Sequence, residues 1–478
     1  MEFTAHTFLF VFFPIILTGY LLLNHRVSQK ILNGYLLIVS LLLYAWVSIK
    51  FFYWFLAIIL LTYILGTVVS GAKEDIREKK KWTAIAVAIF IFLLGYYKYY
   101  TFILENLNTV GWLKGEVEAI AVPIGISFLV FEVISYIVDI ARGDATAGKL
   151  SDVALYLAFF PKLASGPIIL WKHFQPQINA RKSDITMVSD GIDRIIIGYA
   201  KKAIIADTLG AVVAQVHSMS VTGIDRNTYF IWAFLYMLEI YFDFSGYSDI
   251  AIGICRVFGF SVDKNFDYPY VSASVTEFWR RWHISLGTWF REYVYIPLGG
   301  NRKGNVYLNL FIVFLLTGIW HGANWTFLAW GGINGILVML ERYAYKRLWY
   351  QKIPKIIKWI ATMLFVYFMW ILFMSANISE AIEIYRHLLG RTLEENVNFT
   401  YRYFMTYKTG CIALIGGILA VSGANRHVKA ICNSLSGWQI GRYRVGYMVK
   451  TILLLAIFTL VLLFVVNSSY SPFLYFQF

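Results

Sequence analysis

The sequence predicts an all-α integral membrane protein that crosses the bilayer many times. Of its 478 residues, 59% are hydrophobic and only 15% are charged, and the mean hydropathy is +0.62. A soluble protein carries about 25% charged residues, so the composition excludes that class. About eleven to thirteen apolar segments of roughly bilayer length recur along the chain. They are expected to be helical because lipid cannot satisfy backbone hydrogen bonds, and to form one domain over residues 1–478.

Each segment is identified by its length, since a helix that crosses the hydrocarbon core needs about 20 mostly apolar residues. Some segments are expected to re-enter the membrane or to lie in its interface. The candidates are residues 6–23, 31–49, 52–71, 83–100, 119–140, 152–170, 192–214, 228–254, 306–322, 325–342, 356–374, 409–423 and 447–466.

Three stretches interrupt this series. Residues 171–191 are polar and basic, and residues 259–305 are amphipathic and rich in aromatic side chains. Residues 375–408 contain SEAIEIYRHLLG, whose apolar residues recur at helical spacing. This pattern predicts an amphipathic helix that lies in the membrane interface.

The distribution of Lys and Arg predicts the orientation of the chain. The loops at 24–30, 72–82 and 141–151 carry nine of these residues, whereas the intervening loops carry three. Basic loops stay in the cytoplasm, so the N-terminus is expected outside. The net charge of +14 therefore indicates anionic lipid headgroups or an anionic substrate as partners, and no nucleic-acid motif is present.

Neither a metal nor a signal peptide is expected. Cys255, Cys411 and Cys432 share no short spacing and predict neither a disulfide framework nor a zinc site. The N-terminal segment lacks a basic region and a small-residue cleavage site, so we interpret it as the first membrane span.

One histidine lies in an apolar stretch, TGIWHGANW at residues 317–325. Ionisable groups at membrane depth usually face a cavity or a partner. Gly318 and Gly322 flank His321 and permit close approach of another helix or a substrate, while Trp320 and Trp325 supply walls. A core histidine bonded to a neighbouring helix is the alternative interpretation.

A second histidine belongs to the densest polar cluster of the chain, residues 276–304. His283 follows Trp279 by four residues and precedes Gly287 by four, which predicts that the three share one helix face. The segment also carries five cations, namely Arg280, Arg281, Arg291, Arg302 and Lys303. Either these form a vestibule for a phosphate-bearing donor, which the arginine fork suits, or the segment is a cytoplasmic interfacial helix.

Acidic residues in apolar runs are expected to form structural ion pairs, because a buried carboxylate needs a partner. Asp243 and Asp249 would pair with the cations of the 280s cluster, the nearest in sequence, and Glu132 and Glu239 with others. A catalytic role is the alternative interpretation of Asp243 and Asp249.

The two histidines suit one chemistry, the transfer of an acyl group from a thioester to a hydroxyl. A neutral imidazole takes the proton as the hydroxyl attacks, and an unperturbed histidine has a pKa of about 6.5, suited to this step. No serine-hydrolase elbow, P-loop, HExxH or dinucleotide motif accompanies them.

The ordered motifs resemble those of the membrane-bound O-acyltransferases, in particular the bacterial branch that acetylates polysaccharides such as alginate. The core of the resemblance spans about residues 123–342, and the final SPFLYFQF also matches. The motifs are PIGISF, FFPKLASGPI, YFDFSGYSDIAIG, FWRRWHISLGTWFREYVYIPLGGNR and GIWHGANW.

This resemblance implies a ring of helices around a central tunnel in the bacterial cytoplasmic membrane. His321 would be the catalytic base and His283 a second functional residue, while Trp279 and Trp320 would line the tunnel. Arg280, Arg281 and Arg291 are weaker candidates for donor binding. Acetyl-CoA would be the donor substrate, with no bound cofactor. An extracytoplasmic SGNH-type partner would place the acetyl group on a polysaccharide acceptor.

Three alternatives remain. A teichoic acid D-alanyltransferase would use a D-alanyl carrier protein as its donor, although the long 375–408 stretch and the terminal FQF favour acetylation. A transporter or flippase of lipid-linked sugars would need coupled ions or lipid movement. A scaffold for glycan export is the third. The motifs do not distinguish among acceptor glycans.

Overall fold

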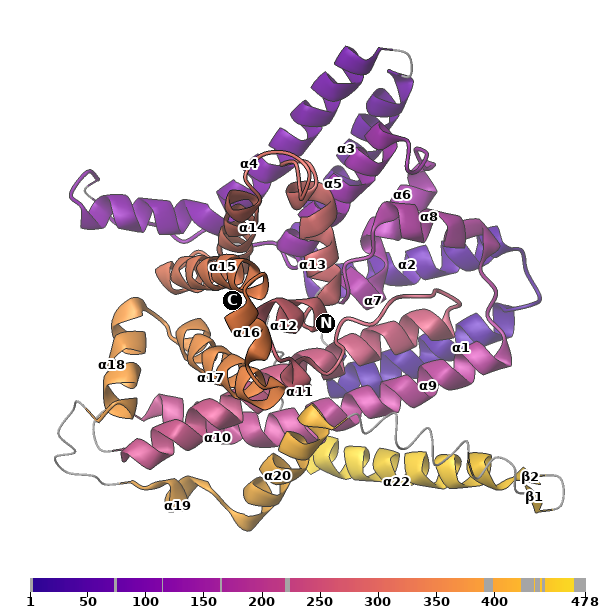
Figure 1. The fold of residues 1–478 in the computed structure, drawn as a ribbon. Helices are drawn as coiled ribbons and strands as arrows, with labels where there is room; N and C mark the ends of the chain where they lie inside the picture. The colour runs from indigo at the N-terminus through magenta and orange to yellow at the C-terminus, as the bar shows by residue number, and fades with distance from the viewer. Residues whose placement is uncertain are drawn as a thin grey trace. The chain divides into compact units, whose positions relative to one another are not determined.

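The computed structural model describes most of the chain (Figure 1). The described residues are 3–72, 75–113, 115–163, 166–219, 224–390, 399–422, 434, 439–440 and 443–467. They belong to two compact units, called unit 1 (1–192, 251–263 and 288–301) and unit 2 (193–250, 264–287 and 302–478). The expectation of one domain over residues 1–478 stays a prediction.

Unit 1 is helical. It contains η1 (Phe8–Phe12), α1 (Phe13–Leu23), α2 (Gln29–Val47), α3 (Ile49–Gly71), α4 (Ile76–Thr109), α5 (Ile126–Arg142), α6 (Leu150–Ala158), α7 (Phe160–Leu163), α8 (Trp171–Ala180) and η4 (Arg291–Tyr295). Three helices are divided between the units along the sequence: α9 (Ile185–Tyr199), α11 (Arg226–Val257) and α13 (Ile284–Phe290).

Unit 2 is also helical, apart from two-residue strands β1 (Gln439–Ile440) and β2 (Tyr443–Arg444), which pair antiparallel. Its helices are η2 (Ala200–Ala206), α10 (Asp207–Ser218), η3 (Pro269–Val271), α12 (Val275–Arg281), α14 (Val306–His321), α15 (Trp325–Tyr345), α16 (Leu348–Lys352), α17 (Lys355–Met374), α18 (Ile378–Leu388), α19 (Tyr401–Phe404), α20 (Tyr407–Val421) and α22 (Val445–Asn467).

The predicted fold class, an all-α polytopic membrane protein, is confirmed. Among the described residues, α2, α3, α4, α17 and α22 are long and apolar enough to cross a membrane. Shorter apolar helices cover residues 8–23, 306–321 and 407–421. The count of eleven to thirteen crossing helices, and their ring around a tunnel, stay predictions.

Two of the predicted spans have the wrong bounds, because proline residues interrupt or delay their helices. The span at 152–170 is broken, because α6 ends at Ala158 and α7 is only four residues long. Pro161 has no N–H with which to continue the backbone ladder of α6. The span at 119–140 begins late, at Ile126, after Pro123 and a left-handed Gly125.

The stretch at 375–408 contains the predicted amphipathic helix as α18. Asn377 caps it, accepting the Glu380 backbone N–H at 2.9 Å. Its placement in the membrane interface stays a prediction. Residues 391–398 and the terminal SPFLYFQF lie outside the described part of the chain.

Asp243, Asp249 and Glu132 form ion pairs, but the 280s cluster does not supply their cations, and the predicted pairing of Glu239 is wrong, since Glu239 forms no ion pair among the described residues. In unit 2, Asp249 pairs with Lys201 at 2.6 Å and with Arg194 at 2.8 Å, and Asp243 pairs with Lys202 at 2.6 Å. These cations come from α9 and η2, which pack beside α11, so proximity in sequence is a poor guide to the partner. Glu239, also on α11, has a carboxylate oxygen without a hydrogen-bond partner among the described residues.

In unit 1, the predicted pairing of Glu132 is confirmed. Its partner is Lys162 at 2.5 Å, and both side chains are almost completely buried. The Lys162 ammonium also lies 4.1 Å from the centre of the Tyr156 ring. The pair joins α5 to the short helix α7.

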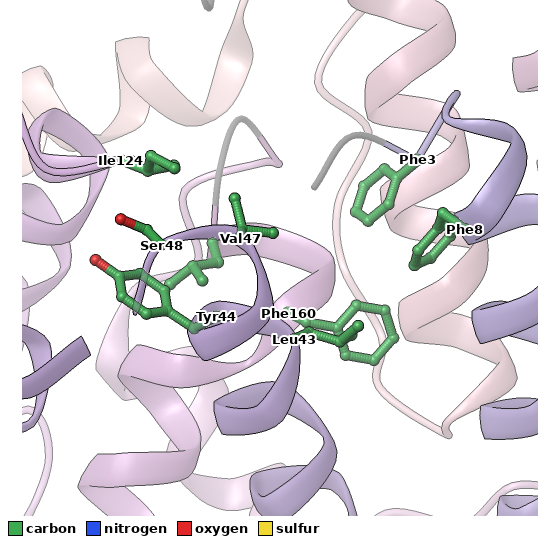
Figure 2. Close-up of a pocket in the computed structure, with 9 residues that line it drawn as sticks. Phe3, Phe8, Leu43, Tyr44, Val47, Ser48, Ile124 and Phe160 are labelled. Atoms are coloured by element: carbon green, nitrogen blue, oxygen red, sulfur yellow. The ribbon is translucent and has the colours of Figure 1, made fainter. Parts of the chain in front are cut away.

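A small cavity in unit 1 is lined by apolar side chains and two hydroxyls, those of Tyr44 and Ser48 (Figure 2). Its volume is about 40 Å³. Ligand sites usually occupy several hundred Å³, so this cavity is a packing defect rather than a substrate site.

In unit 2, α14 and α15 form a tight hairpin whose backbones meet at two glycines. A Cβ on Gly331 would lie 2.6 Å from the Phe314 carbonyl oxygen and 3.0 Å from the Cα of Gly318. A Cβ on Gly318 would lie 2.3 Å from the Phe327 carbonyl oxygen. Small residues at both positions are therefore required for this crossing.

We expect Gly331→Ala to destabilise the protein by about 1–3 kcal/mol, because the added methyl group forces the two helices apart. The matched control is Gly332→Ala, where a Cβ would meet nothing within 4 Å. Alanine there improves helix propensity by up to about 1 kcal/mol. Thermal unfolding of both variants in detergent measures the difference, and equal midpoints would contradict the close crossing.

Candidate functional site

His321 is the last residue of α14, where the chain turns sharply into α15. Gly322 continues in an extended conformation, and a Cβ on it would lie 2.3 Å from the Phe327 ring. Asn324 caps α15 by accepting the Thr326 backbone N–H at 3.0 Å. The Asn324 amide also donates to the Ala376 carbonyl at 2.6 Å. The turn that follows His321 is thus held by the hydrogen bonds of Asn324 and by the packing of Gly322 against Phe327.

Aromatic side chains surround the His321 ring, which is only 7% exposed. The ring centres of Trp320, Trp330 and Phe373 lie 5.1, 5.3 and 5.1 Å from it, and that of Phe327 lies 6.2 Å away. Trp325 was expected as a wall, but it points outward and is 53% exposed. The walls are the predicted Trp320 on α14, Phe327 and Trp330 further along α15, and Phe373 on α17.

His283 occupies a break between two helices. The structure corrects the prediction that Trp279, His283 and Gly287 share one helix face, because α12 ends at Arg281 and α13 begins at Ile284. His283 itself has φ +45°, a left-handed conformation that is uncommon outside glycine. Residues on either side of His283 therefore belong to two separate helices and do not share a helical repeat.

Asn265 holds this break in place. Its backbone carbonyl accepts the Ile284 N–H at 2.9 Å, and its side-chain oxygen accepts the Ser285 N–H at 3.1 Å. Its amide donates to the Ser248 hydroxyl at 3.2 Å. Asn265 is 1% exposed, so these bonds form in a dry environment where they are hard to replace.

The His283 imidazole is held as the neutral form. Its Nδ1 accepts the Leu286 backbone N–H at 3.3 Å, so the proton of the neutral ring resides on Nε2. The ring packs edge-on against Phe244 with centres 4.7 Å apart. Burial lowers the pKa of His283 to about 3 because it removes the solvation of the charged form.

The structure brings the two histidines to one tryptophan. The Trp320 ring centre lies 6.2 Å from that of His283 and 5.1 Å from that of His321. Trp279 lies in the same unit, 5.2 Å from Trp330, and its indole N–H donates to Asn334 at 3.1 Å. These four predicted residues therefore line one aromatic site.

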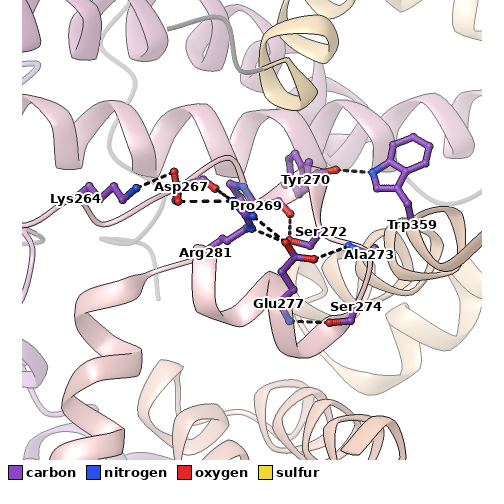
Figure 3. A network of polar contacts seen from close by, with 10 residues as sticks. All are labelled: Lys264, Asp267, Pro269, Tyr270, Ser272, Ala273, Ser274, Glu277, Arg281 and Trp359. Carbon is purple, nitrogen blue, oxygen red and sulfur yellow. Dashed lines mark hydrogen bonds and ion pairs between the residues drawn. The ribbon is translucent and has the colours of Figure 1, made fainter. Parts of the chain in front are cut away.

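The predicted cations do not gather in the same way. Arg281 is held in a polar network with Glu277, at 2.8 Å, and Asp267 (Figure 3). Glu277 and Arg281 lie four residues apart on α12, the spacing at which side chains of a helix meet. Arg280 is exposed at the end of α12. Arg291 belongs to unit 1, where its exposed side chain pairs with Glu292 at 2.9 Å.

Several residues that build the site were missed by the sequence analysis. They are Asn265, Trp330, Phe373 and Glu341, whose two carboxylate oxygens accept the first N–H groups of α12 at 2.8 and 2.7 Å. Asn265, Phe373 and Glu341 act on residues at least 17 positions away in the sequence. Only Trp330 had a local signal, since it follows the histidine motif on the same helix face as Phe327 and Asn334.

No metal centre accompanies these residues in the part of the chain that the structure describes, where no three His, Cys, Asp or Glu side chains cluster. The polar groups gathered among these buried aromatic side chains are the imidazoles of His283 and His321 and the indole N–H of Trp330, whereas the Trp279 indole N–H is engaged with Asn334.

The site lies within a region of the chain that is similar to known proteins. The sequence model of MBOAT, the membrane-bound O-acyltransferase family, matches residues 141–379. The probable alginate O-acetylase of Pseudomonas putida is 38% identical, with all of both chains aligned. The peptidoglycan O-acetyltransferase of Helicobacter pylori is 30% identical over 81% of this chain and 80% of its own. The teichoic acid D-alanyltransferase of Bacillus subtilis is 27% identical over 50% of this chain and 62% of its own.

We expect His283 to remain neutral from about pH 8 to about pH 5, the range in which an ordinary histidine gains its charge. A pKa lowered by burial means that the neutral form persists until the pH falls far below this range. Nitrogen-15 NMR of labelled histidines in detergent, with His283→Asn to identify the signal, measures this. A midpoint near the ordinary value of about 6.5 would contradict the burial of this ring.

Proposed function

This chain belongs to the membrane-bound O-acyltransferase family, and we propose that it moves acetyl groups from a cytosolic thioester, acetyl-CoA, across the membrane for O-acetylation of a secreted or cell-surface polysaccharide. Its relatives support this reaction, since they include alginate and peptidoglycan O-acetylating proteins. The observation that carries the proposal for the site is the contact of Trp320 with both histidine rings.

His321 acts as the general base. Its imidazole takes the proton from the acceptor hydroxyl as that oxygen attacks the acetyl carbonyl carbon. The tetrahedral adduct then collapses, the carbon–sulfur bond of the thioester breaks, and the departing CoA sulfur takes the proton from the imidazolium. The aromatic walls exclude water, which would otherwise compete as the attacking group.

His283 assists as a hydrogen-bond donor. Because Nδ1 accepts the Leu286 N–H, Nε2 carries the proton and presents it as a donor. A donor of this kind binds the acetyl carbonyl more strongly once negative charge develops on the oxygen. Since the ring stays neutral, it contributes a dipole rather than a full charge.

Acetyl is favoured over D-alanyl as the group transferred. The acetylating relatives align with 81–100% of this chain, whereas the teichoic acid D-alanyltransferase aligns with 50%. The chain belongs to an acyltransferase family, and no observation favours the alternative functions of a flippase or a scaffold. The acceptor glycan is of the secreted or cell-surface class that the relatives modify.

The remaining assignments concern the surroundings of the site. Arg280 is the first choice for the donor phosphates, because its side chain is exposed three residues before His283. Arg281 and Arg291 are secondary choices, since each is engaged with a carboxylate. The protein resides in the cytoplasmic membrane with its N-terminus outside, and an extracytoplasmic SGNH-type partner places the acetyl group on the polysaccharide.

We expect His321→Ala to lower thioester turnover by about 10²- to 10⁴-fold, the usual contribution of a general base. The control is His217→Ala, which removes a half-exposed imidazole from α10 in the same unit. Purified protein in nanodiscs is assayed with radiolabelled acetyl-CoA, with alginate and peptidoglycan fragments as acceptors.

A parallel assay replaces acetyl-CoA with a D-alanyl carrier protein. Turnover from the carrier alone would replace the proposed acetyl transfer by the D-alanyl reaction. Acetyl-CoA turnover that is equal in wild type and His321→Ala would remove His321 from the mechanism while leaving the reaction class intact.

A further inference from the structure

Trp330 lies on α15 against the proposed base and is 1% exposed. Its ring centre is 5.3 Å from that of His321, and the two ring planes are nearly perpendicular at 82°. It also contacts Trp279 at 5.2 Å and Phe373 at 5.5 Å. Among the contacts of His321, Trp330 is the indole presented by the facing helix of the hairpin.

The indole N–H of Trp330 has no hydrogen-bond partner among the residues that the structure describes. The Trp370 indole N–H shares this state among the described residues, but its ring lies against Trp282 and not against His321. Five other tryptophans donate to defined acceptors, in the pairs Trp171–Thr146, Trp232–Val213, Trp279–Asn334, Trp289–Phe131 and Trp359–Tyr270. Buried donors are almost always paired, because burying one alone costs free energy. The Trp330 N–H, unpaired in the described part of the chain, lies beside the proposed base, so the substrate can supply the acceptor that this N–H lacks.

The position of this indole is fixed by the hairpin. The neighbouring Gly331 lies against Gly318 of α14, so α15 cannot shift away from the helix that ends in His321. The Asn334 amide donates to the Trp330 carbonyl at 2.9 Å and its oxygen accepts from Trp279, which ties this turn of α15 to α12. A donor held in this way needs no reorganisation during the reaction.

We propose that the Trp330 indole N–H is a catalytic hydrogen-bond donor that binds the acetyl carbonyl oxygen and stabilises the oxyanion formed when the acceptor hydroxyl attacks. The inference rests on the proposed function. An indole N–H is a donor only, so its partner must be an acceptor. The carbonyl oxygen is the acceptor that lies next to the base during acyl transfer, and it gains negative charge in the transition state.

The test separates the N–H group from the ring that carries it. Trp330→Phe removes the donor and part of the ring, whereas a benzothienylalanine introduced at residue 330 keeps the bicyclic ring and replaces N–H by sulfur. The matched control is Trp370→Phe, since Trp370 is similarly buried and its ring lies 4.8 Å from Trp282 instead of contacting His321. Thermal unfolding of each protein is recorded alongside activity.

Turnover is measured with acetyl-CoA, with a D-alanyl carrier protein and with 4-nitrophenyl acetate, which presents the acetyl carbonyl without the CoA body. We expect Trp330→Phe and the benzothienylalanine protein to lose about 10²-fold in kcat with KM changed by less than about threefold, as for removal of an oxyanion donor. Trp370→Phe is expected to keep wild-type kcat.

The possible outcomes are distinct. Activity restored by benzothienylalanine would overturn the inference, because the ring and not the N–H would then matter. Activity kept in Trp330→Phe would also overturn it, because neither the N–H nor the bicyclic ring would then be needed. An equal loss in Trp370→Phe would also overturn it, as a general packing effect. No turnover by the wild type from any of the three donors, with the glycan fragments and an SGNH-type partner present, would overturn the proposed function, and the inference with it.

Discussion

The close crossing of α14 and α15 at Gly318 and Gly331 is the constraint on which the site in unit 2 depends. At this distance the helices leave no room for a Cβ, so the chain must turn within three residues after His321. The turn delivers the imidazole to the aromatic face of α15, and α17 completes the enclosure through Phe373. A wider crossing would separate the base from the indole that contacts it.

The position of His283 depends instead on the interruption of a helix. Between α12 and α13 the backbone adopts a left-handed conformation at His283, and Asn265 replaces the helical hydrogen bonds that are lost there. Such local strain persists only where surrounding contacts enforce it, and it concentrates at functional sites. The interruption turns the imidazole of His283 toward Trp320 instead of along a continuous helix.

Sequence reasoning reached the helical class and the two histidines because both leave local signals: apolar runs of bilayer length, and an ionisable group within such a run. It failed where the outcome depended on distant residues. The partners of Asp243 and Asp249 come from α9 and η2, and the walls of the site come from Phe327, Trp330 and Phe373. The helical spacing of Trp279, His283 and Gly287 wrongly predicted that they share a helix face. Asn265 enforces a helix break at His283, and the local sequence pattern gives no sign of this break.

Whether His283 and His321 act in one site is measured by a double-mutant cycle of the two residues. The rates of wild type, His283→Asn, His321→Ala and the double variant are compared, with asparagine chosen because it tolerates the left-handed backbone. Groups that act as a unit lose far less together than the product of their separate losses. We predict this shortfall, and a double variant whose loss equals the product would show that the histidines act independently.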